Sequence, residues 1–94
     1  MEVLQIEISN LARKQLNKIP RLIKENFLEW VDRINKMGIQ ETRKIKGYYD
    51  EPLKGTRQGQ RSVRLNRAYR AIYIQRRLGE FKILEVLEIN KHRY

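Results

Sequence analysis

The sequence predicts a single α+β domain over residues 1–94, in which two N-terminal helices pack on one face of a twisted, mainly antiparallel sheet. Three observations predict the order β-α-α-β-β-β. An alternating apolar pattern opens the chain, a stripe of helical period follows it, and three alternating runs with short turns fill the last third. Ninety-four residues are enough for one small core, and no linker, repeat or low-complexity segment divides the chain.

The N-terminal segment is predicted to be a half-buried strand followed by a helix. The run Leu4–Ile8 alternates between apolar and polar residues, which places its apolar side chains on one inward face. Ser9 or Asn10 can cap the helix that follows. Pro20 then marks either the start of a second helix or a sharp turn between two helices, because proline lacks the amide hydrogen that a helix interior needs.

The second helix has the clearest pattern in the chain. Its apolar residues form one stripe, and charged residues cover the other side. We expect the stripe to form core rather than a partner-binding surface, since aromatic residues on such a stripe are usually buried. Gly38 is predicted to end this helix, and the segment 40–46 has room for another helical turn. The stripe consists of Ile23, Phe27, Trp30, Val31 and Ile34.

Glycine and proline bracket the segment 47–52, which is therefore predicted to be a loop. The loop contains two adjacent tyrosines, Tyr48 and Tyr49. Tyrosines in such a loop can stack on nucleic-acid bases. The commoner arrangement has one ring packed into the body of the protein and the other partly exposed, and we expect that arrangement here.

The last third of the chain is predicted to be a three-stranded antiparallel meander. Its strands cover residues 61–66, 69–75 and 81–89, with turns at 66–68 and 76–80. The middle strand is apolar on both parities, which indicates a central position. Arg70 shares its parity with Ile72, and the period alone leaves open which face is solvated. The long connection through two helices lets the first strand join the edge of this meander.

The composition limits the possible function classes. A formal net charge of +10 predicts a nucleic acid, an anionic surface or an acidic protein as the partner. The absence of cysteine excludes disulfides and cysteine-based zinc sites or nucleophiles, and a single histidine excludes a conventional multi-histidine metal site. We therefore expect no metal and no cofactor. No apolar run approaches the roughly 20 residues that cross a bilayer, and the N-terminus lacks the basic region of a signal peptide, so we expect a cytoplasmic protein without membrane contact.

The positive charge is concentrated in one block. Between Pro52 and Gly79 the chain contains no Asp or Glu but eight basic residues. Like charges close together destabilise a fold, so an uninterrupted block of this kind predicts contact with a polyanion. The block contains Lys54, Arg57, Arg61, Arg64, Arg67, Arg70, Arg76 and Arg77.

The same block carries a family resemblance. The run Glu51-Pro52-Leu53-Lys54-Gly55, with Arg57 and Gly59, is followed by Ser62-Val63-Arg64-Leu65, by Tyr69-Arg70-Ala71-Ile72-Tyr73 and by the terminal Lys91-His92-Arg93-Tyr94. This pattern resembles the RelE/ParE superfamily of toxins from type II toxin–antitoxin systems, and most of all the RelE- and HigB-type mRNA interferases. The resemblance covers essentially the whole chain and implies a RelE-like microbial ribonuclease fold.

The resemblance also implies an activity and its partners. RelE- and HigB-type toxins cut mRNA at the ribosomal A site without a metal, which implies a ribosome-dependent endoribonuclease that inhibits translation. The implied partners are a cognate antitoxin, expected to be a helix-turn-helix DNA-binding protein, together with mRNA on the ribosome and 16S rRNA. ParE-type members inhibit DNA gyrase instead and lack the ribonuclease residues.

Metal-free RNA cleavage needs a base for the 2′-OH, cations for the phosphoryl oxygens and an acid for the leaving 5′-oxygen. The resemblance assigns a loop lysine to Lys54 and a strand arginine to Arg70. A second basic position is matched by Arg64 or Arg67, which the pattern does not separate. The remaining arginines are predicted to contact the RNA backbone without reading its sequence. The catalytic set is Lys54, Arg64, Arg70, His92 and Tyr94, and the RNA-binding set is Arg57, Arg61, Arg67, Arg76 and Arg77.

The residue that takes the 2′-OH proton stays open at the level of sequence. His92, Tyr94 and Lys54 are all candidates, since histidine titrates near neutrality and neighbouring cations lower the pKa of lysine or tyrosine. Some HigB-like proteins have a histidine where this chain has Glu51, so that role is either absent or transferred to Glu51, which can equally form an ordinary ion pair with an arginine.

Two rival functions fit the composition. One is a ParE-like gyrase inhibitor without nuclease activity, which the terminal His92 and Tyr94 and the loop Lys54 argue against. The other is a nucleic-acid-binding module without catalysis. The 5′ ends of mRNA after a brief induction separate all three functions, because only the nuclease leaves cuts within codons.

Overall fold

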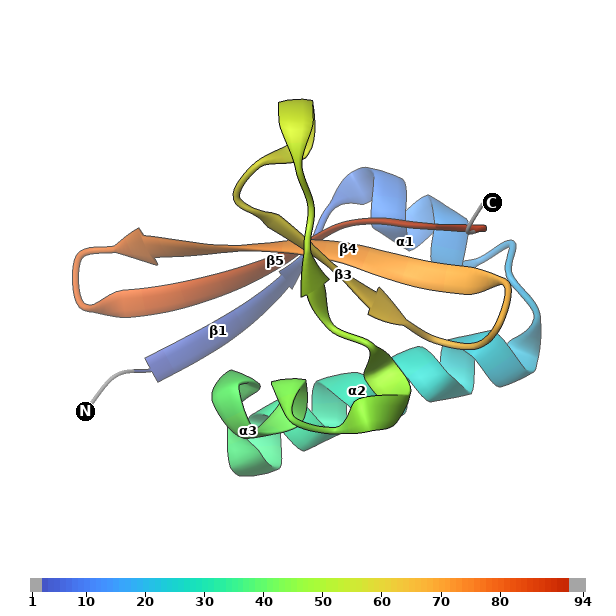
Figure 1. Ribbon diagram of the computed structural model, residues 1–94, viewed down its shortest axis with the longest axis horizontal. Coiled ribbons are helices and arrows are strands. Elements are labelled where there is room, and N and C mark those ends of the chain that lie inside the picture. The colour runs from blue at the N-terminus through green and yellow to red at the C-terminus, as the bar shows by residue number, and fades with distance from the viewer. Residues whose placement is uncertain (1–2, 92–94) are drawn as a thin grey trace.

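The computed structural model describes residues 3–91 and shows five strands, three α-helices and two short 3₁₀-helices (Figure 1). The predicted order of strand, two helices and three strands is confirmed, and further short elements lie in the middle of the chain. The elements are β1 (Val3–Ile8), α1 (Asn10–Leu16), α2 (Arg21–Met37), α3 (Ile39–Arg43), η1 (Lys46–Tyr48), β2 (Glu51–Pro52), η2 (Gly55–Arg57), β3 (Gln60–Arg64), β4 (Tyr69–Leu78) and β5 (Phe81–Lys91).

The strands form one sheet in the order β1-β5-β4-β3-β2. Strands β3, β4 and β5 make the predicted antiparallel meander with β4 in its centre. Strand β1 joins the edge of the meander as predicted and runs parallel to β5, because the chain returns to the sheet through the helices. The sheet is therefore mixed but mainly antiparallel.

Strand β2 corrects the prediction that residues 47–52 are entirely loop. Glu51 pairs with Ser62 and Pro52 pairs with Arg61, which adds a short fifth strand at the sheet edge. Two residues are too few to give a periodic signal, and proline, which cannot donate a backbone hydrogen bond, is tolerated in a strand at such an edge.

The hairpin between β4 and β5 is longer than predicted. The sequence placed residues 76–80 in a turn, whereas β4 continues to Leu78 and the turn is reduced to Gly79 and Glu80. The two consecutive arginines resemble turn residues, but Arg76 forms an ion pair with Glu85 on the neighbouring strand, which stabilises extended pairing there. Strand β5 likewise extends beyond the predicted end to Lys91.

The helix boundaries follow the sequence signals. Ser9 is the N-cap of α1, where its Oγ accepts a hydrogen bond from the Ala12 amide at 3.0 Å and donates one to the Leu87 carbonyl at 2.7 Å. The cap therefore also ties α1 to β5. Pro20 precedes α2, and Gly38 ends it with a φ of 85°, a conformation that glycine adopts without a steric penalty.

The core lies between the helices and one face of the sheet. The stripe of α2 is buried as predicted, with Val31 only partly covered. Trp30 packs against the Tyr73 ring with their centroids 5.3 Å apart. Within residues 3–91, no helix combines the length and the apolar character needed to cross a membrane. The fully buried residues that unite these elements include Ala12, Phe27, Trp30, Val63, Ala71, Tyr73, Leu84 and Val86.

Candidate functional site

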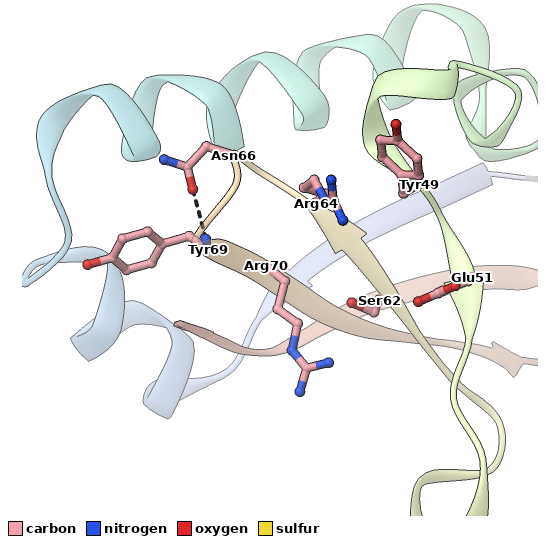
Figure 2. Close-up of a pocket in the computed structure, with 7 residues that line it drawn as sticks. All are labelled: Tyr49, Glu51, Ser62, Arg64, Asn66, Tyr69 and Arg70. Atoms are coloured by element: carbon pink, nitrogen blue, oxygen red, sulfur yellow. Dashed lines mark hydrogen bonds between the residues drawn. The ribbon is translucent and has the colours of Figure 1, made fainter. Parts of the chain in front are cut away.

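A shallow recess lies on the face of the sheet opposite the core (Figure 2). It holds about 40 Å³ of space open to water, enough for a few water molecules but too little to enclose a nucleotide. A nucleotide would therefore lie across the recess. Its lining comes from the segment before β3, from β3 itself, from the β3–β4 turn and from the start of β4, and it consists of Tyr49, Glu51, Ser62, Arg64, Asn66, Tyr69 and Arg70.

Arg64 and Arg70 lie side by side in this recess. They are directly opposite each other in the β3–β4 ladder, so their side chains leave the sheet on the same face. The Nε of Arg70 donates to Asn90 Oδ1 at 3.2 Å, and the Arg64 guanidinium lies over the Tyr49 ring, 4.3 Å from its centroid. Within residues 3–91, neither arginine forms an ion pair. Two arginines that leave neighbouring strands on one face, neither paired with a carboxylate in this range, can bind phosphate oxygens.

The β3–β4 turn fixes the relative position of the two arginines. Asn66 Oδ1 accepts hydrogen bonds from the amides of Ala68 and Tyr69, both at 2.8 Å, which closes the predicted turn. Asn26 of α2 donates to the Leu65 carbonyl at 3.0 Å and holds the turn against the helix. Hydrogen bonds therefore fix the turn that joins the two strands carrying Arg64 and Arg70.

Glu51 brings a carboxylate to the same recess. Its partner in the ladder is Ser62, whose neighbours on that face of the sheet include Arg64. Glu51 is exposed and forms no ion pair within residues 3–91. The sequence left Glu51 either a role transferred from a histidine or an ordinary ion pair with an arginine. The structure disfavours the ion pair.

The residue between Tyr49 and Glu51 points to the opposite side of the sheet. The Asp50 side chain is 1% exposed, and it accepts hydrogen bonds from Arg61 Nε at 2.6 Å and from the Tyr73 hydroxyl at 2.5 Å. The Tyr73 oxygen also accepts a bond from Arg43 Nε at 3.3 Å. This cluster of Asp50, Arg61, Tyr73 and Arg43 is called the Asp50 cluster below.

The Asp50 cluster perturbs the acidities of its members. Burial, reinforced by the hydrogen bond to Asp50, raises the pKa of Tyr73 to about 12. Burial lowers the pKa of Arg61, but the hydrogen bond and the charge of Asp50 outweigh it, and the net pKa is raised. Both shifts keep the two donors, Tyr73 and Arg61, in their protonated forms.

The structure brings together only part of the predicted catalytic set. Arg64 and Arg70 share the recess, whereas Lys54 is exposed at the start of η2 and does not line it. His92 and Tyr94 lie outside the described residues. Strand β5 ends at Lys91, which is paired with Tyr69 of the recess lining. Catalysis by these residues stays a prediction.

The predicted RNA-binding arginines differ in their surroundings. Arg57 pairs with Glu88, Arg76 pairs with Glu85, and Arg61 belongs to the Asp50 cluster on the helix-covered side. Arg67 in the β3–β4 turn and Arg77 near the end of β4 are exposed. Contact of these five residues with RNA also stays a prediction, but three of them already have an internal carboxylate partner.

Two acidic residues had no role in the sequence interpretation. Asp50 gave no signal, since an acidic residue in a loop is ordinary. Glu88 is 15% exposed on the recess face, where it holds Arg57. The irregular register at Ile72/Tyr73 inserts Leu87, so that Val86 and Ile89 face the core and Glu88 faces the open side. Simple alternation would have given Glu88 the parity of Val86.

Solved structures of other proteins share this fold. A YoeB/ParE toxin from Agrobacterium tumefaciens matches with a TM-score of 0.73 and 17% identity, over 95% of this chain and 99% of that one. The toxin chain of a YoeB–YefM complex from Staphylococcus aureus matches with a TM-score of 0.68 and 19% identity, over 96% and 98%. An archaeal RelE–RelB complex from Pyrococcus horikoshii OT3 matches with a TM-score of 0.65 and 20% identity, over 95% and 94%.

The chain has the fold of the RelE/ParE toxins. The resemblance in the sequence is thereby confirmed at the level of the fold. No protein-family model and no curated protein matches this sequence. Among the described residues, no group of three or more His, Cys, Asp or Glu side chains is arranged to hold a metal ion. The charged side chains that line the recess are those of Arg64, Arg70 and Glu51.

Proposed function

We propose that this protein is the toxin of a type II toxin–antitoxin pair and acts as a ribosome-dependent endoribonuclease on mRNA in the cytoplasm. The observation that carries the proposal is the recess on a RelE/ParE toxin fold, which is lined by Arg64, Arg70 and Glu51; Glu51 forms no ion pair within residues 3–91. The basic net charge supports a nucleic-acid substrate, and so does the lack of an ion pair at both arginines in the part of the chain that the structure describes. Structural neighbours in complex with YefM and RelB support a protein antitoxin as the partner.

The proposed chemistry is transfer of the phosphate to the neighbouring 2′-oxygen. A base removes the 2′-OH proton, the 2′-oxygen bonds to phosphorus, and the bond to the 5′-oxygen breaks. The products are a 2′,3′-cyclic phosphate and a 5′-hydroxyl, whose proton comes from an acid. Arg64 and Arg70 hold the phosphoryl oxygens and offset the charge that builds on them. Glu51 is the carboxylate next to this pair, and His92, Tyr94 and Lys54 are the other candidates for proton transfer.

The deciding experiment maps mRNA 5′ ends after a brief induction in cells. We expect new ends within codons for the wild type and their loss in Arg70→Ala, by about 100-fold or more, because a charge that faces the transition state is removed. Arg21→Ala is the matched control, since Arg21 is 93% exposed on α2, away from the recess, and the same charge is lost. Intact mRNA in wild-type cells would contradict the nuclease, and a gyrase block with intact mRNA would support the ParE-like alternative.

The base is identified by single-turnover cleavage on programmed ribosomes. Glu51→Gln keeps the shape of the side chain but removes its proton affinity, and we expect a rate loss of about 100-fold to 10,000-fold. The His92→Ala and Lys54→Ala variants serve as parallel tests. If Glu51→Gln cleaves at the wild-type rate while one of the others does not, the base is that other residue.

A further inference from the structure

Tyr49 has an unusual backbone. Its φ is 43°, and within residues 3–91 it is the one non-glycine residue with a positive φ. The other positive-φ positions in that range are all glycines, at Gly38, Gly55, Gly59 and Gly79. A side chain makes this conformation costly, so glycine or asparagine would serve better if only a turn were needed. The need for a turn therefore does not explain a tyrosine at this position, and we infer that its side chain has a role of its own.

The surrounding structure holds this conformation from both sides. On one side, the Tyr49 amide donates to the Lys46 carbonyl at 3.1 Å and closes η1. On the other side, Asp50 is anchored by Arg61 and Tyr73, and the Tyr73 ring is itself packed against Trp30 in the core. Strained backbone that is fixed by its surroundings in this way is typical of functional sites.

The Tyr49 ring is presented to the recess and not to the core. Its residue is 61% exposed, whereas the adjacent Tyr48 packs against the core, as the sequence predicted for such a pair. The Arg64 guanidinium lies against the ring at 4.3 Å, and Arg70 is the neighbour of Arg64 across the ladder (Figure 2). The fold thus places an exposed aromatic ring against Arg64 and in the same recess as Arg70, and neither arginine forms an ion pair among the described residues.

We propose that Tyr49, held by Asp50, is a stacking subsite for an unpaired nucleobase adjacent to the phosphate bound by Arg64 and Arg70. An exposed ring beside a phosphate-binding site is in position to stack on the base of a bound nucleotide, and such stacking requires a base that is not paired in a duplex. The identity of the ligand as RNA rests on the proposed function. An acidic peptide that covers the two arginines is the competing occupant, but it gives no reason for an aromatic ring in a strained conformation.

The test measures binding of a fluorescent single-stranded RNA heptamer carrying 2′-O-methyl groups, which cannot be cleaved, by anisotropy at low salt. Tyr49→Ala is expected to weaken binding by roughly 5-fold to 100-fold, the usual effect of losing one stacked base, and Tyr49→Phe is expected to bind like the wild type. Phe81→Ala is the matched control, since Phe81 is 50% exposed at the tip of the β4–β5 hairpin, far from Tyr69 and the recess (Figure 1).

A set of heptamers with a single abasic position locates the stacked base. For the wild type, one abasic position should weaken binding, and in Tyr49→Ala the same position should make no difference. Asp50→Asn retains the Tyr49 side chain but removes the charge that anchors residue 50 to Arg61. Because residue 49 is then no longer fixed, this variant should show most of the loss of Tyr49→Ala. Equal binding by the wild type and Tyr49→Ala, or no binding of the heptamer by the wild type, overturns the stacking subsite.

The binding test of the stacking subsite and the cleavage test of the proposed nuclease can fail separately. If the protein stacks the base through Tyr49 but leaves mRNA intact in cells, the proposed cleavage is wrong and the subsite stands. If mRNA is cut and Tyr49→Ala binds normally, the subsite is wrong and the cleavage stands. Binding of a polyglutamate peptide with the same dependence on Tyr49 as the RNA would assign the ring to an acidic protein partner and overturn the subsite.

Discussion

Arg61 and Arg64 lie on the same strand, three residues apart, and have opposite surroundings. An odd spacing on a strand places the two side chains on opposite faces. Arg61 points to the helix-covered side, where Asp50 and Tyr73 surround it and its side chain is 25% exposed. Arg64 points to the open side, where it lies on Tyr49 and forms no ion pair within residues 3–91. One arginine is structural and the other is available to a ligand.

The difference shows that the net charge of a sequence segment does not predict which of its charged side chains are unpaired on the folded surface. The basic block contains no carboxylate of its own, yet the fold supplies three from outside it. Asp50, Glu85 and Glu88 come from the chain on either side and pair with Arg61, Arg76 and Arg57. Arg64 and Arg70 thus differ from these three arginines because they form no ion pair within residues 3–91. Their position marks the candidate site.

The largest effect on stability is expected from Asp50→Ala. The substitution leaves Arg61 and Tyr73 without their buried acceptor, so the free energy of unfolding should fall by about 3–5 kcal/mol. Chemical denaturation measures this loss. The exposed pair of Arg21 and Glu25 is the comparison, because breaking it by Glu25→Ala should cost less than about 1 kcal/mol. Similar losses in both variants would show that the Asp50 cluster is no more important than a surface pair.

Exchanging Arg61 and Arg64 for alanine separates their roles directly. Arg61→Ala removes charged hydrogen bonds and should cost about 1.5–3 kcal/mol of unfolding free energy. Arg64→Ala loses only the contact with Tyr49 and should cost about 1 kcal/mol or less. The salt dependence of RNA binding should change in Arg64→Ala and not in Arg61→Ala.

For a single-stranded RNA, the slope of log K against log salt should become shallower by about 0.7 in Arg64→Ala, since one phosphate contact is lost. The slope should be unchanged in Arg61→Ala. If the two variants lower the slope equally, Arg61 also reaches the RNA and the contrast between the two faces is wrong.

The pKa of Tyr73 predicts a loss of stability in alkaline solution. The folded protein keeps the Tyr73 proton up to about pH 12, whereas an unfolded tyrosine releases it near pH 10. The stabilising contribution is therefore complete below pH 10 and is lost as the pH rises from 10 to 12, by at most about 1.4 kcal/mol per pH unit. Tyr73→Phe lacks this group and should show the shallower decline in unfolding experiments across that range. Parallel declines in the two proteins would contradict the shifted pKa.

Much of the fold could be predicted because its signals are local. The stripe on α2, the cap at Ser9, the break at Gly38 and the alternation in β3 each depend on neighbouring residues. The parts that were missed depend on distant partners. Strand β2 exists only because β3 is beside it, and the extension of β4 through Arg76 is supported by the ion pair of Arg76 with Glu85 on β5.

The same distinction applies to the candidate site. The sequence singled out Arg64 and Arg70, and their shared face follows from the register of β3 and β4. The orientation of the segment before β3 could not be predicted, because it depends on Asp50 finding Arg61 eleven residues later and Tyr73 twenty-three residues later. Glu51 and Tyr49 enter the recess as a consequence of that anchor.

The sharpest comparison is expected when Asp50, Arg61 and Tyr73 are replaced by apolar side chains of similar volume. The triple variant Asp50→Leu, Arg61→Met, Tyr73→Phe removes a buried charge pair together with its desolvation cost, so the free energy of unfolding should stay within about 1–2 kcal/mol of the wild type. Packing against Trp30 is kept, because the phenylalanine ring replaces that of Tyr73. The variant lacks, however, the hydrogen bonds by which Asp50 fixes the segment that carries Tyr49 and Glu51. The triple variant should therefore unfold like the wild type but bind the uncleavable RNA as weakly as Tyr49→Ala. Wild-type RNA binding by a stable triple variant would mean that the cluster stabilises the protein without positioning the recess.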